Sequence, residues 1–188
     1  APPGIRRIWH LREILALENL GFDVKRVSIR PPESTYVDAQ DELERSKTNS
    51  LLQAGAVAIL LAILKCSVTR TISLARTIIL SMKMGYRSDR GLIIYMIYVA
   101  EACLLYTWAK SWKVEHIHVH FGTNPASVSL FCNMIGGPGY SFTPHGPDEY
   151  DKPEALGLPE KISHSSFIAA ISNYTRSQLY RWSVLSDW

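Results

Sequence analysis

The stretch "HIHVHFGTNPASVSLFCNMIGGPGYSFTPHGP", residues 116–147, reads as strand, turn, helix, turn and strand. Strand formers occupy 116–121 and 140–143, and Pro125 suits the first turn of a helix that runs to about residue 135. The Pro-His-Gly-Pro sequence at 144–147 cannot continue a strand, because proline offers no N–H to a sheet. The stretch therefore predicts a β-α-β unit with parallel strands.

The same alternation continues on both sides of this unit. A short helix is predicted at 159–165, a strand at 167–171, and a helix to residue 182 with Ser172 as its N-cap. Towards the N-terminus we expect a helix at 8–20 that ends at Gly21, a strand at 22–29 and a short helix at 38–47. The predicted fold class is α/β, with a Rossmann-like parallel sheet flanked by helices.

Residues 51–113 differ from this pattern and predict a helix-rich apolar insertion, with breaks near 65–67, 85 and 91. Basic residues punctuate these helices, and Trp108 and Trp112 lie four residues apart. Two interpretations stay open: the apolar side chains form core, or they rest on anionic lipid with Lys and Arg at the rim and Trp at the headgroups.

The sequence predicts a soluble or membrane-attached chain that does not cross a bilayer. The uncharged apolar run at 51–64 is shorter than the ~20 residues that a membrane-spanning helix needs. The longer run at 92–109 contains Glu101, and no signal peptide is evident at the N-terminus.

Composition narrows the class of protein further. A length of 188 residues supports one domain with a substantial core, and the three cysteines are widely spaced among apolar neighbours. This cysteine usage predicts buried thiols in a reducing cytoplasm. The net charge of +3, without a basic stripe or a nucleic-acid-binding motif, disfavours a nucleic-acid partner.

Three predicted strands end in polar turns: 120–124, 143–148 and 172–176. The carboxyl ends of parallel strands meet at one edge of a sheet, where ligands of open α/β sheets bind. His145 is the candidate catalytic residue, because Pro144 fixes it and Gly146 lets a ligand approach the backbone. An imidazole there can donate to a sugar hydroxyl or to a developing oxyanion. Glu149 and its neighbour Asp148 are expected to be solvated turn residues rather than a catalytic pair.

The alternating histidines at 116, 118 and 120 project from one face of their strand and suggest a different chemistry. Two histidines at this spacing can hold zinc with a third ligand from elsewhere. This arrangement would fit a metal-dependent hydrolase. The alternative is that His116 and His118 pack or make ordinary hydrogen bonds, and the main prediction has no metal site.

Several blocks of the chain resemble the N-terminal domain of family 4 glycosyltransferases with the GT-B fold, in the exopolysaccharide and colanic-acid biosynthesis branch. The blocks are "HLREILALENLGFDVKRVSIR", "HIHVHFGTNPASVSL", "YSFTPHGPDEYDKPEALGLPEKI" and "FIAAISNYTRSQLYRW". The resemblance covers 11–30 and 116–188, and extends to the middle only in helical character. It implies one half of a GT-B fold and sugar transfer from a nucleotide-sugar donor with retention, without a required metal or other cofactor.

By position, the resemblance places His145 near the donor sugar and the reacting centre. It makes His120, Gly122, Thr123 and Asn124 the lining of the acceptor side of the cleft. Ser172 and Arg176 would sit at the cleft edge below the donor phosphates. Gly146 and Asp148 complete the predicted substrate-binding set.

The chain departs from the family at both ends. "APPGIRRIWH" replaces the usual first strand and loop, and the C-terminal nucleotide-sugar domain is absent. Residues 1–188 are therefore expected to be a single acceptor-side domain, inactive alone, of an enzyme that builds bacterial surface polysaccharide on a lipid-linked or saccharide acceptor. The expected location is the cytoplasm, peripherally on the inner face of the cell membrane, with self-association through exposed apolar surface. The rival function is a non-catalytic carbohydrate- or membrane-binding module.

Overall fold

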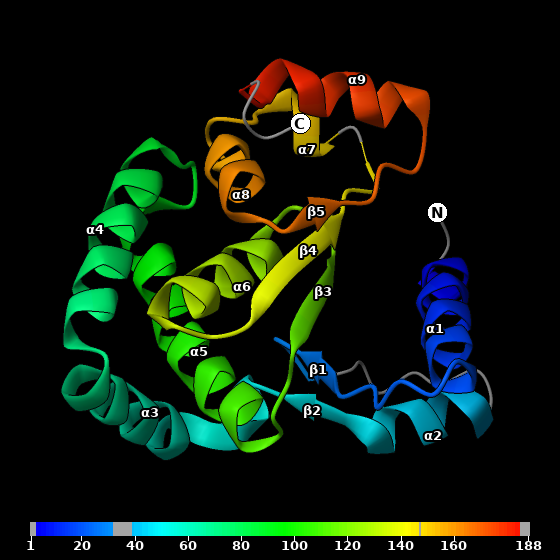
Figure 1. Ribbon diagram of the computed structural model, residues 1–188, viewed down its shortest axis with the longest axis horizontal. Coiled ribbons are helices and arrows are strands. Elements are labelled where there is room, and N and C mark those ends of the chain that lie inside the picture. The colour runs from blue at the N-terminus through cyan, green and yellow to red at the C-terminus, as the bar shows by residue number, and fades with distance from the viewer. Residues whose placement is uncertain (1–2, 32–38, 147, 185–188) are drawn as a thin grey trace. The chain divides into compact units, whose positions relative to one another are not determined.

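The structure, a computed structural model, describes residues 3–31, 39–146 and 148–184. The chain is α/β, mostly helical, and its described residues form two small parallel sheets (Figure 1). It divides into two compact units, Ala1–Gln53 and Ala54–Trp188.

In the unit Ala1–Gln53 the described residues form two helices and a two-stranded parallel sheet. Its elements are α1 (Pro3–Asn19), β1 (Arg26–Ser28), α2 (Ala39–Lys47) and β2 (Thr48–Ser50). Gly21, with φ +91°, ends α1 in the left-handed conformation that glycine adopts easily, as predicted. The predicted strand at 22–29 shortens to three residues, and β2 was not predicted.

Arg26 joins the elements of this unit. Its guanidinium, almost fully buried, bonds Glu18 of α1 at 2.8 Å and Glu44 of α2 at 2.6 Å. The hydrogen bond from Arg26 lowers the pKa of Glu18. A strand of three residues forms few backbone hydrogen bonds to its neighbour. The two ion pairs of Arg26 therefore help to fix β1 between the helices.

The second unit is larger and follows the predicted order of elements except for one short helix at 148–151, where a turn was predicted. After the 3₁₀ turn η1 (Leu52–Ala54) come three long helices, α3 (Gly55–Thr69), α4 (Thr71–Arg87) and α5 (Gly91–Ser111). The rest is β3 (His116–His120), α6 (Asn124–Ile135), β4 (Gly139–Thr143), α7 (Asp148–Asp151), α8 (Leu158–His164), β5 (Phe167–Ile168) and α9 (Asn173–Trp182). The strands pair in the order β3-β4-β5, all parallel.

The predicted helical breaks in the middle of the chain are partly wrong. α3 continues through 65–67 and ends at Thr69. The next residue, Arg70, has a non-helical backbone with φ −135° and ψ 33°. Gly85 lies inside α4. A Cβ added at this position would lie only 3.0 Å from the Cβ of Tyr95, so the glycine allows α4 and α5 to pack closely. Gly91, with φ +79°, does begin a new helix.

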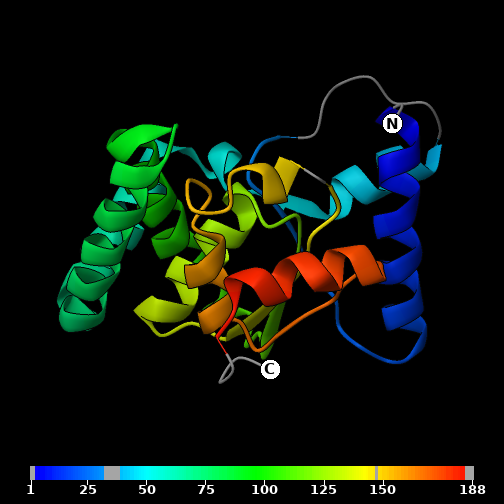
Figure 2. The same cartoon turned by 90° about the horizontal axis from the view of Figure 1, so that it is seen from above.

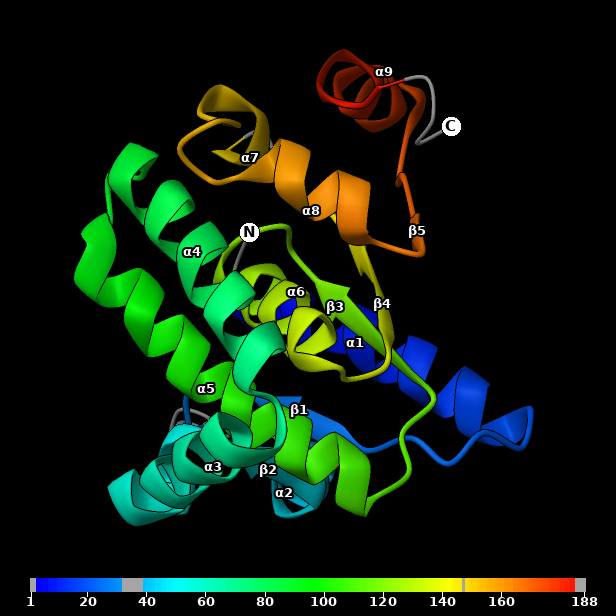
Figure 3. The same ribbon diagram turned by 60° about the vertical axis from the view of Figure 1, so that its left-hand side comes forward.

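The core of this unit lies between the sheet and the long helices. α6 packs on β3 and β4, α5 packs on α6, and α3 and α4 lie outermost (Figures 1 and 3). Phe131 of α6 is fully buried, and its ring meets Tyr95 of α5 at 6.4 Å. All three cysteines are free and buried, as predicted, and burial raises the pKa of Cys132 to about 12.

Replacing Phe131 should reveal how much the α5–α6 contact stabilises this unit. Phe131→Ala removes a fully buried ring and leaves a cavity, so we expect a loss of about 3–5 kcal/mol of unfolding free energy in urea titrations. The matched control is Phe167→Ala, whose ring is 56% exposed, with an expected loss of about 1 kcal/mol or less. Equal losses in the two variants would contradict this placement of the core.

Candidate functional site

The polar turns predicted after 116–121 and 140–143 meet at one edge of the sheet. The third strand, predicted at 167–171, spans only Phe167–Ile168, so the segment 172–176 starts a helix four residues beyond the strand end. His120 pairs with Thr143 in the β3–β4 register, so the two strands end level. The N–H of Phe121 donates to the carbonyl of Thr143 at 2.8 Å, and the N–H of Ala169 donates to that of Phe142 at 3.1 Å. Figure 1 shows the carboxyl ends of β3 and β4 pointing towards α7, α8 and α9.

The two histidines of the predicted site touch one another. Nδ1 of His120 lies 3.1 Å from Nε2 of His145, so one ring donates a hydrogen bond to the other. The His145 ring also packs 4.8 Å from the ring of Phe121. Phe121 holds φ at +72°, a conformation that costs a bulky residue of order 1–3 kcal/mol. Backbone strain at the turn is thus coupled to the placement of His145.

Glu149 was predicted to be a solvated turn residue, and this is wrong. Its side chain, in α7, is buried with 2% exposure. One carboxylate oxygen accepts from the N–H of Gly122, and the other accepts from the N–H groups of His145 at 2.6 Å and Gly146 at 3.1 Å. A single carboxylate therefore ties the turn after β3 to the turn after β4. These three N–H donors offset the cost of burying the carboxylate, and the carboxylate in turn gives each of the N–H groups a partner.

Lys161 of α8 lies on the other side of the same turn and was missed by the sequence analysis. Its ammonium, fully buried, donates to the carbonyls of Gly122 at 2.7 Å, Thr123 at 3.0 Å and Leu156 at 2.6 Å. Burial lowers the pKa of Lys161 to about 7, and the charges of Glu149 and Glu160 oppose that shift. Helical spacing offered a signal, because Lys161 shares the inward side of α8 with Leu158 and Ile162.

Gly122 is held from both sides and has no room for a side chain. A Cβ there would meet Oε1 of Glu149 at 3.0 Å and the ring of Phe142 at 3.3 Å. Its N–H bonds Glu149 while its carbonyl bonds Lys161. The glycine is thus required by close packing around the buried charges, whereas the sequence predicted it only as a substrate-binding position.

The histidine row continues down the sheet as a hydrogen-bonded ladder. The hydroxyl of Ser141 lies 2.7 Å from Nε2 of His116 and 2.8 Å from Nδ1 of His118. Nε2 of His118 lies 3.0 Å from the hydroxyl of Thr143. His116 also stacks on the ring of Phe167 at 5.5 Å, and burial lowers its pKa. To bind a metal, His118 would have to exchange one of these hydroxyl partners for the ion, and the metal site stays a prediction.

The remaining predicted site residues lie at helix starts around this edge. Ser172 caps α9 as predicted, accepting from the N–H of Thr175 at 3.1 Å, and Arg176 is exposed one turn later. Asn124 begins α6 directly after Thr123, one residue before the predicted start at Pro125. Asp148 begins α7, and its side chain lies outside the described residues.

α9 is linked to the Glu149 turn through aromatic side chains. The rings of Tyr150 and Tyr174 meet edge to face at 6.3 Å, and Thr175 beside Tyr174 is buried. A Cβ at Gly146 would meet no atom within 4 Å, so space remains beside His145. The structure thus joins Gly122, His145 and Gly146 through Glu149 and brings His120 against His145. Ser172 caps α9, and Arg176 lies in its first turn.

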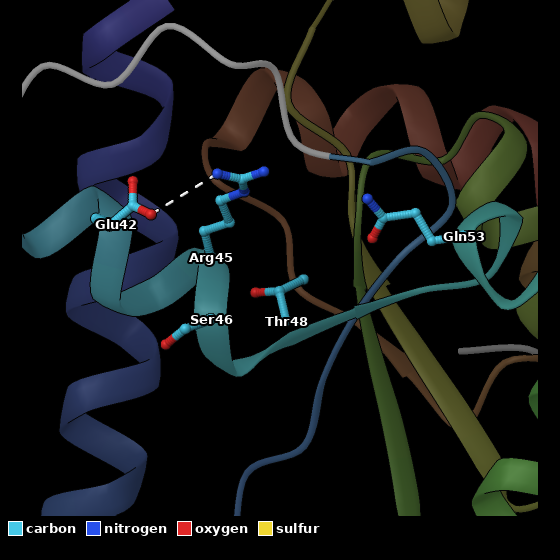
Figure 4. Close-up of a pocket in the computed structure, with 5 residues that line it drawn as sticks. All are labelled: Glu42, Arg45, Ser46, Thr48 and Gln53. Atoms are coloured by element: carbon cyan, nitrogen blue, oxygen red, sulfur yellow. Dashed lines mark ion pairs between the residues drawn. The ribbon is translucent and has the colours of Figure 1, made fainter.

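Two surface hollows are lined by other residues. One, of about 250 Å³ in the unit Ala1–Gln53, is lined by Glu42, Arg45, Ser46, Thr48 and Gln53 (Figure 4). Glu42 and Arg45 pair there at 3.7 Å across one turn of α2, an arrangement typical of a solvated helix surface. The other, of about 470 Å³, lies at the turn between α4 and α5. The better candidate site is the histidine cluster formed by His116, His118, His120 and His145, because their rings offer proton donors and acceptors at the sheet edge.

Comparisons with known proteins do not identify the chain. No family model matches the sequence, and no curated protein or solved structure matches it significantly.

Removing the charge of Glu149 should loosen both turns. In Glu149→Gln one carboxylate oxygen becomes an NH₂ group that faces backbone N–H donors, so we expect a loss of about 2–4 kcal/mol in urea unfolding. Glu154→Gln, an exposed change in the same region, should cost less than about 0.5 kcal/mol. The amide resonances of Gly122, His145 and Gly146 should shift in the first variant. Unchanged stability and amide shifts would show that the turns hold without this carboxylate.

Lys161 should make stability depend on pH above neutrality. Between pH 7 and the usual lysine pKa of ~10.4, the unfolded chain carries a proton that the folded chain has released. Stability should therefore rise with pH across this window, approaching ~1.4 kcal/mol per unit. The measurement is urea unfolding from pH 7 to about 9.5, compared with Lys161→Met, in which this rise should disappear. Parallel pH profiles for the two proteins would mean that Lys161 keeps its proton.

Proposed function

We propose that this chain is the acceptor-side half of a retaining glycosyltransferase, a single N-terminal GT-B domain that works with a nucleotide-sugar domain on another part of the enzyme. The observation that carries this proposal is the His120–His145 contact at the carboxyl edge of the sheet, held by Glu149. Ligands of open parallel sheets bind at this edge. The resemblance of residues 116–188 to the N-terminal domains of family 4 glycosyltransferases supports the choice of sugar transfer.

In this proposal His145 is the catalytic residue and His120 positions it. When Nε2 of His145 accepts from His120, the proton of the neutral ring resides on Nδ1, so the His120 contact fixes the tautomer. A neutral imidazole of defined tautomer can donate to a hydroxyl of the donor sugar or to charge that develops on an oxygen in the transition state. The strained Phe121 turn and the Glu149 bonds hold this geometry before substrate arrives.

The other predicted residues take supporting roles in the proposal. Thr123 and Asn124 line the acceptor side, Gly122 holds their turn in place, and Gly146 and Asp148 border His145. Ser172 and Arg176, at the start of α9, lie below the donor phosphates, where a helix N-terminus and a guanidinium both favour anions. The co-substrate is a nucleotide-sugar, the acceptor is lipid-linked or a saccharide, and no further cofactor is needed.

The test uses an enzyme that contains residues 1–188 followed by a nucleotide-sugar domain. His145→Ala should lower the sugar-transfer rate about 10²–10³-fold, because one positioned donor to developing charge is lost. His164→Ala, an exposed histidine in α8, is the matched control and should leave the rate near that of the parent. Rate and melting temperature are measured for each variant. Sugar transfer at the parental rate by His145→Ala would remove the catalytic assignment.

The rival functions predict no sugar transfer and a different property that can be measured. A non-catalytic module would bind saccharide or membrane without turnover in any arrangement with a donor domain. A metal hydrolase would hold zinc at one ion per chain and lose it on substitution of His118.

A further inference from the structure

Three helices of the unit Ala54–Trp188 expose large apolar side chains to solvent. Val57 and Val68 of α3, Ile72 and Tyr86 of α4, and Ile93 of α5 are each between 72% and 85% exposed. On α3 only Ala62 and Cys66 are buried. α3 and α4 lie on the side of this unit away from the β3-β4-β5 sheet, with α5 and α6 between (Figures 2 and 3).

The exposed apolar residues form continuous stripes. Ile72, Ile79 and Tyr86 of α4 are seven residues apart, close to two full helical turns, and so lie in one row. On α3 the exposed residues Val57, Leu64 and Val68 follow spacings of seven and four and form a second row. Stripes of this kind on packed helices normally face a core or a partner.

A row of positive charge runs beside the apolar row of α4. Arg76 and Lys83 are exposed, seven residues apart, and displaced by four residues from Ile72 and Ile79. Arg90 follows in the turn to α5, next to the hollow of about 470 Å³ that Tyr86, Leu92 and Ile93 also line.

Negative charge is scarce on these helices. Within residues 55–111, all of them described, the acidic residues are Asp89 and Glu101. Asp89 bonds Lys152 at 2.5 Å, and Glu101 is buried. The face formed by α3, α4 and the first half of α5 is therefore apolar with a basic border. Trp108 and Trp112, which the sequence suggested for the lipid boundary, are half-buried at the far end of α5 and pack on one another at 5.3 Å.

We propose that this face docks on the surface of an anionic lipid bilayer. The apolar rows enter the boundary between headgroups and acyl chains, and Arg76, Lys83 and Arg90 meet lipid phosphates. The inference is independent of the sugar-transfer proposal, because it rests on exposed side chains away from the histidine cluster. If both hold, docking brings the enzyme to the membrane that carries a lipid-linked acceptor.

Two other occupants of the face fit the observations less well. A second copy of the chain, paired symmetrically, would bring the same basic row of each copy together, and like charges at an interface are unfavourable. A bilayer-spanning arrangement is possible by length and composition alone for Leu52–Thr69 and Gly91–Ser111. However, half of the second segment is buried inside this unit, and α3 packs along α5. Shallow docking keeps these contacts intact.

The test is co-sedimentation of the 188-residue chain with vesicles of phosphatidylcholine alone or with about 30% phosphatidylglycerol. Binding should require the anionic lipid and should weaken as salt rises from about 0.05 M to about 0.5 M, because screening shortens the reach of the charges. Arg76→Gln/Lys83→Gln should weaken binding about 30-fold, at ~1 kcal/mol per charge. Ile72→Ser/Ile79→Ser should also weaken binding, with unchanged melting temperature since both residues are exposed.

The matched controls carry the same changes outside the face. Lys113→Gln/Arg181→Gln removes two exposed charges, and Ile171→Ser/Val184→Ser removes two exposed apolar side chains. Both should bind vesicles like the parent chain. The proposal is overturned if the paired variants match these controls, or if neutral vesicles bind equally well at all salt concentrations. Resistance to alkaline carbonate extraction would show a spanning chain instead. A dimer in dilute buffer that Ile72→Ser/Ile79→Ser dissociates, without vesicle binding, would assign the face to a second copy.

Discussion

The carboxylate of Glu149 is the interaction on which the carboxyl edge of the β3-β4-β5 sheet depends. Where β3 and β4 end, the backbone N–H groups of Gly122, His145 and Gly146 no longer have ladder partners. All three donate to Glu149, so one buried side chain satisfies them and fixes the distance between the two turns. The His120–His145 contact follows from this arrangement, because each turn carries one of the two rings.

A buried carboxylate is costly unless opposite charge and donors surround it. Three backbone N–H groups donate to Glu149, and Lys161 binds the carbonyls of Gly122 and Thr123 from the other side of the peptide. The Tyr140 hydroxyl donates to the carbonyl of Lys161 at 2.7 Å and anchors α8 to β4. The backbone around Gly122 thus lies between the carboxylate of Glu149 on its N–H side and the amino group of Lys161 on its carbonyl side. This rigid support lets Phe121 keep a strained conformation beside His145.

The sequence predicted the features that local chemistry controls. Pro144 ends β4 after Thr143, Ser172 caps α9, and the parallel order of the second half is confirmed. Burial of charge was not predicted, because Glu149 lies in a polar turn that looks solvated and its partners lie on another turn. The helix break at Arg70 was also not predicted. The Arg70 guanidinium donates to the hydroxyl of Tyr106 at 2.8 Å, and Tyr106 lies 36 residues further along the chain. Such tertiary contacts have no local signature.

The unit Ala54–Trp188 distributes its polar and apolar groups against the usual pattern in two places. It buries Glu149 and Lys161 at the sheet edge, and it exposes large apolar side chains on α3, α4 and the start of α5. Each exception costs free energy in water unless something is gained by it. The buried charges gain a fixed backbone geometry around two histidines. The exposed apolar rows gain nothing within this unit, because α6 and the second half of α5 already form a closed core. The proposed contact with an anionic bilayer would offset this cost, because it removes the apolar rows from water and places phosphates beside the basic border.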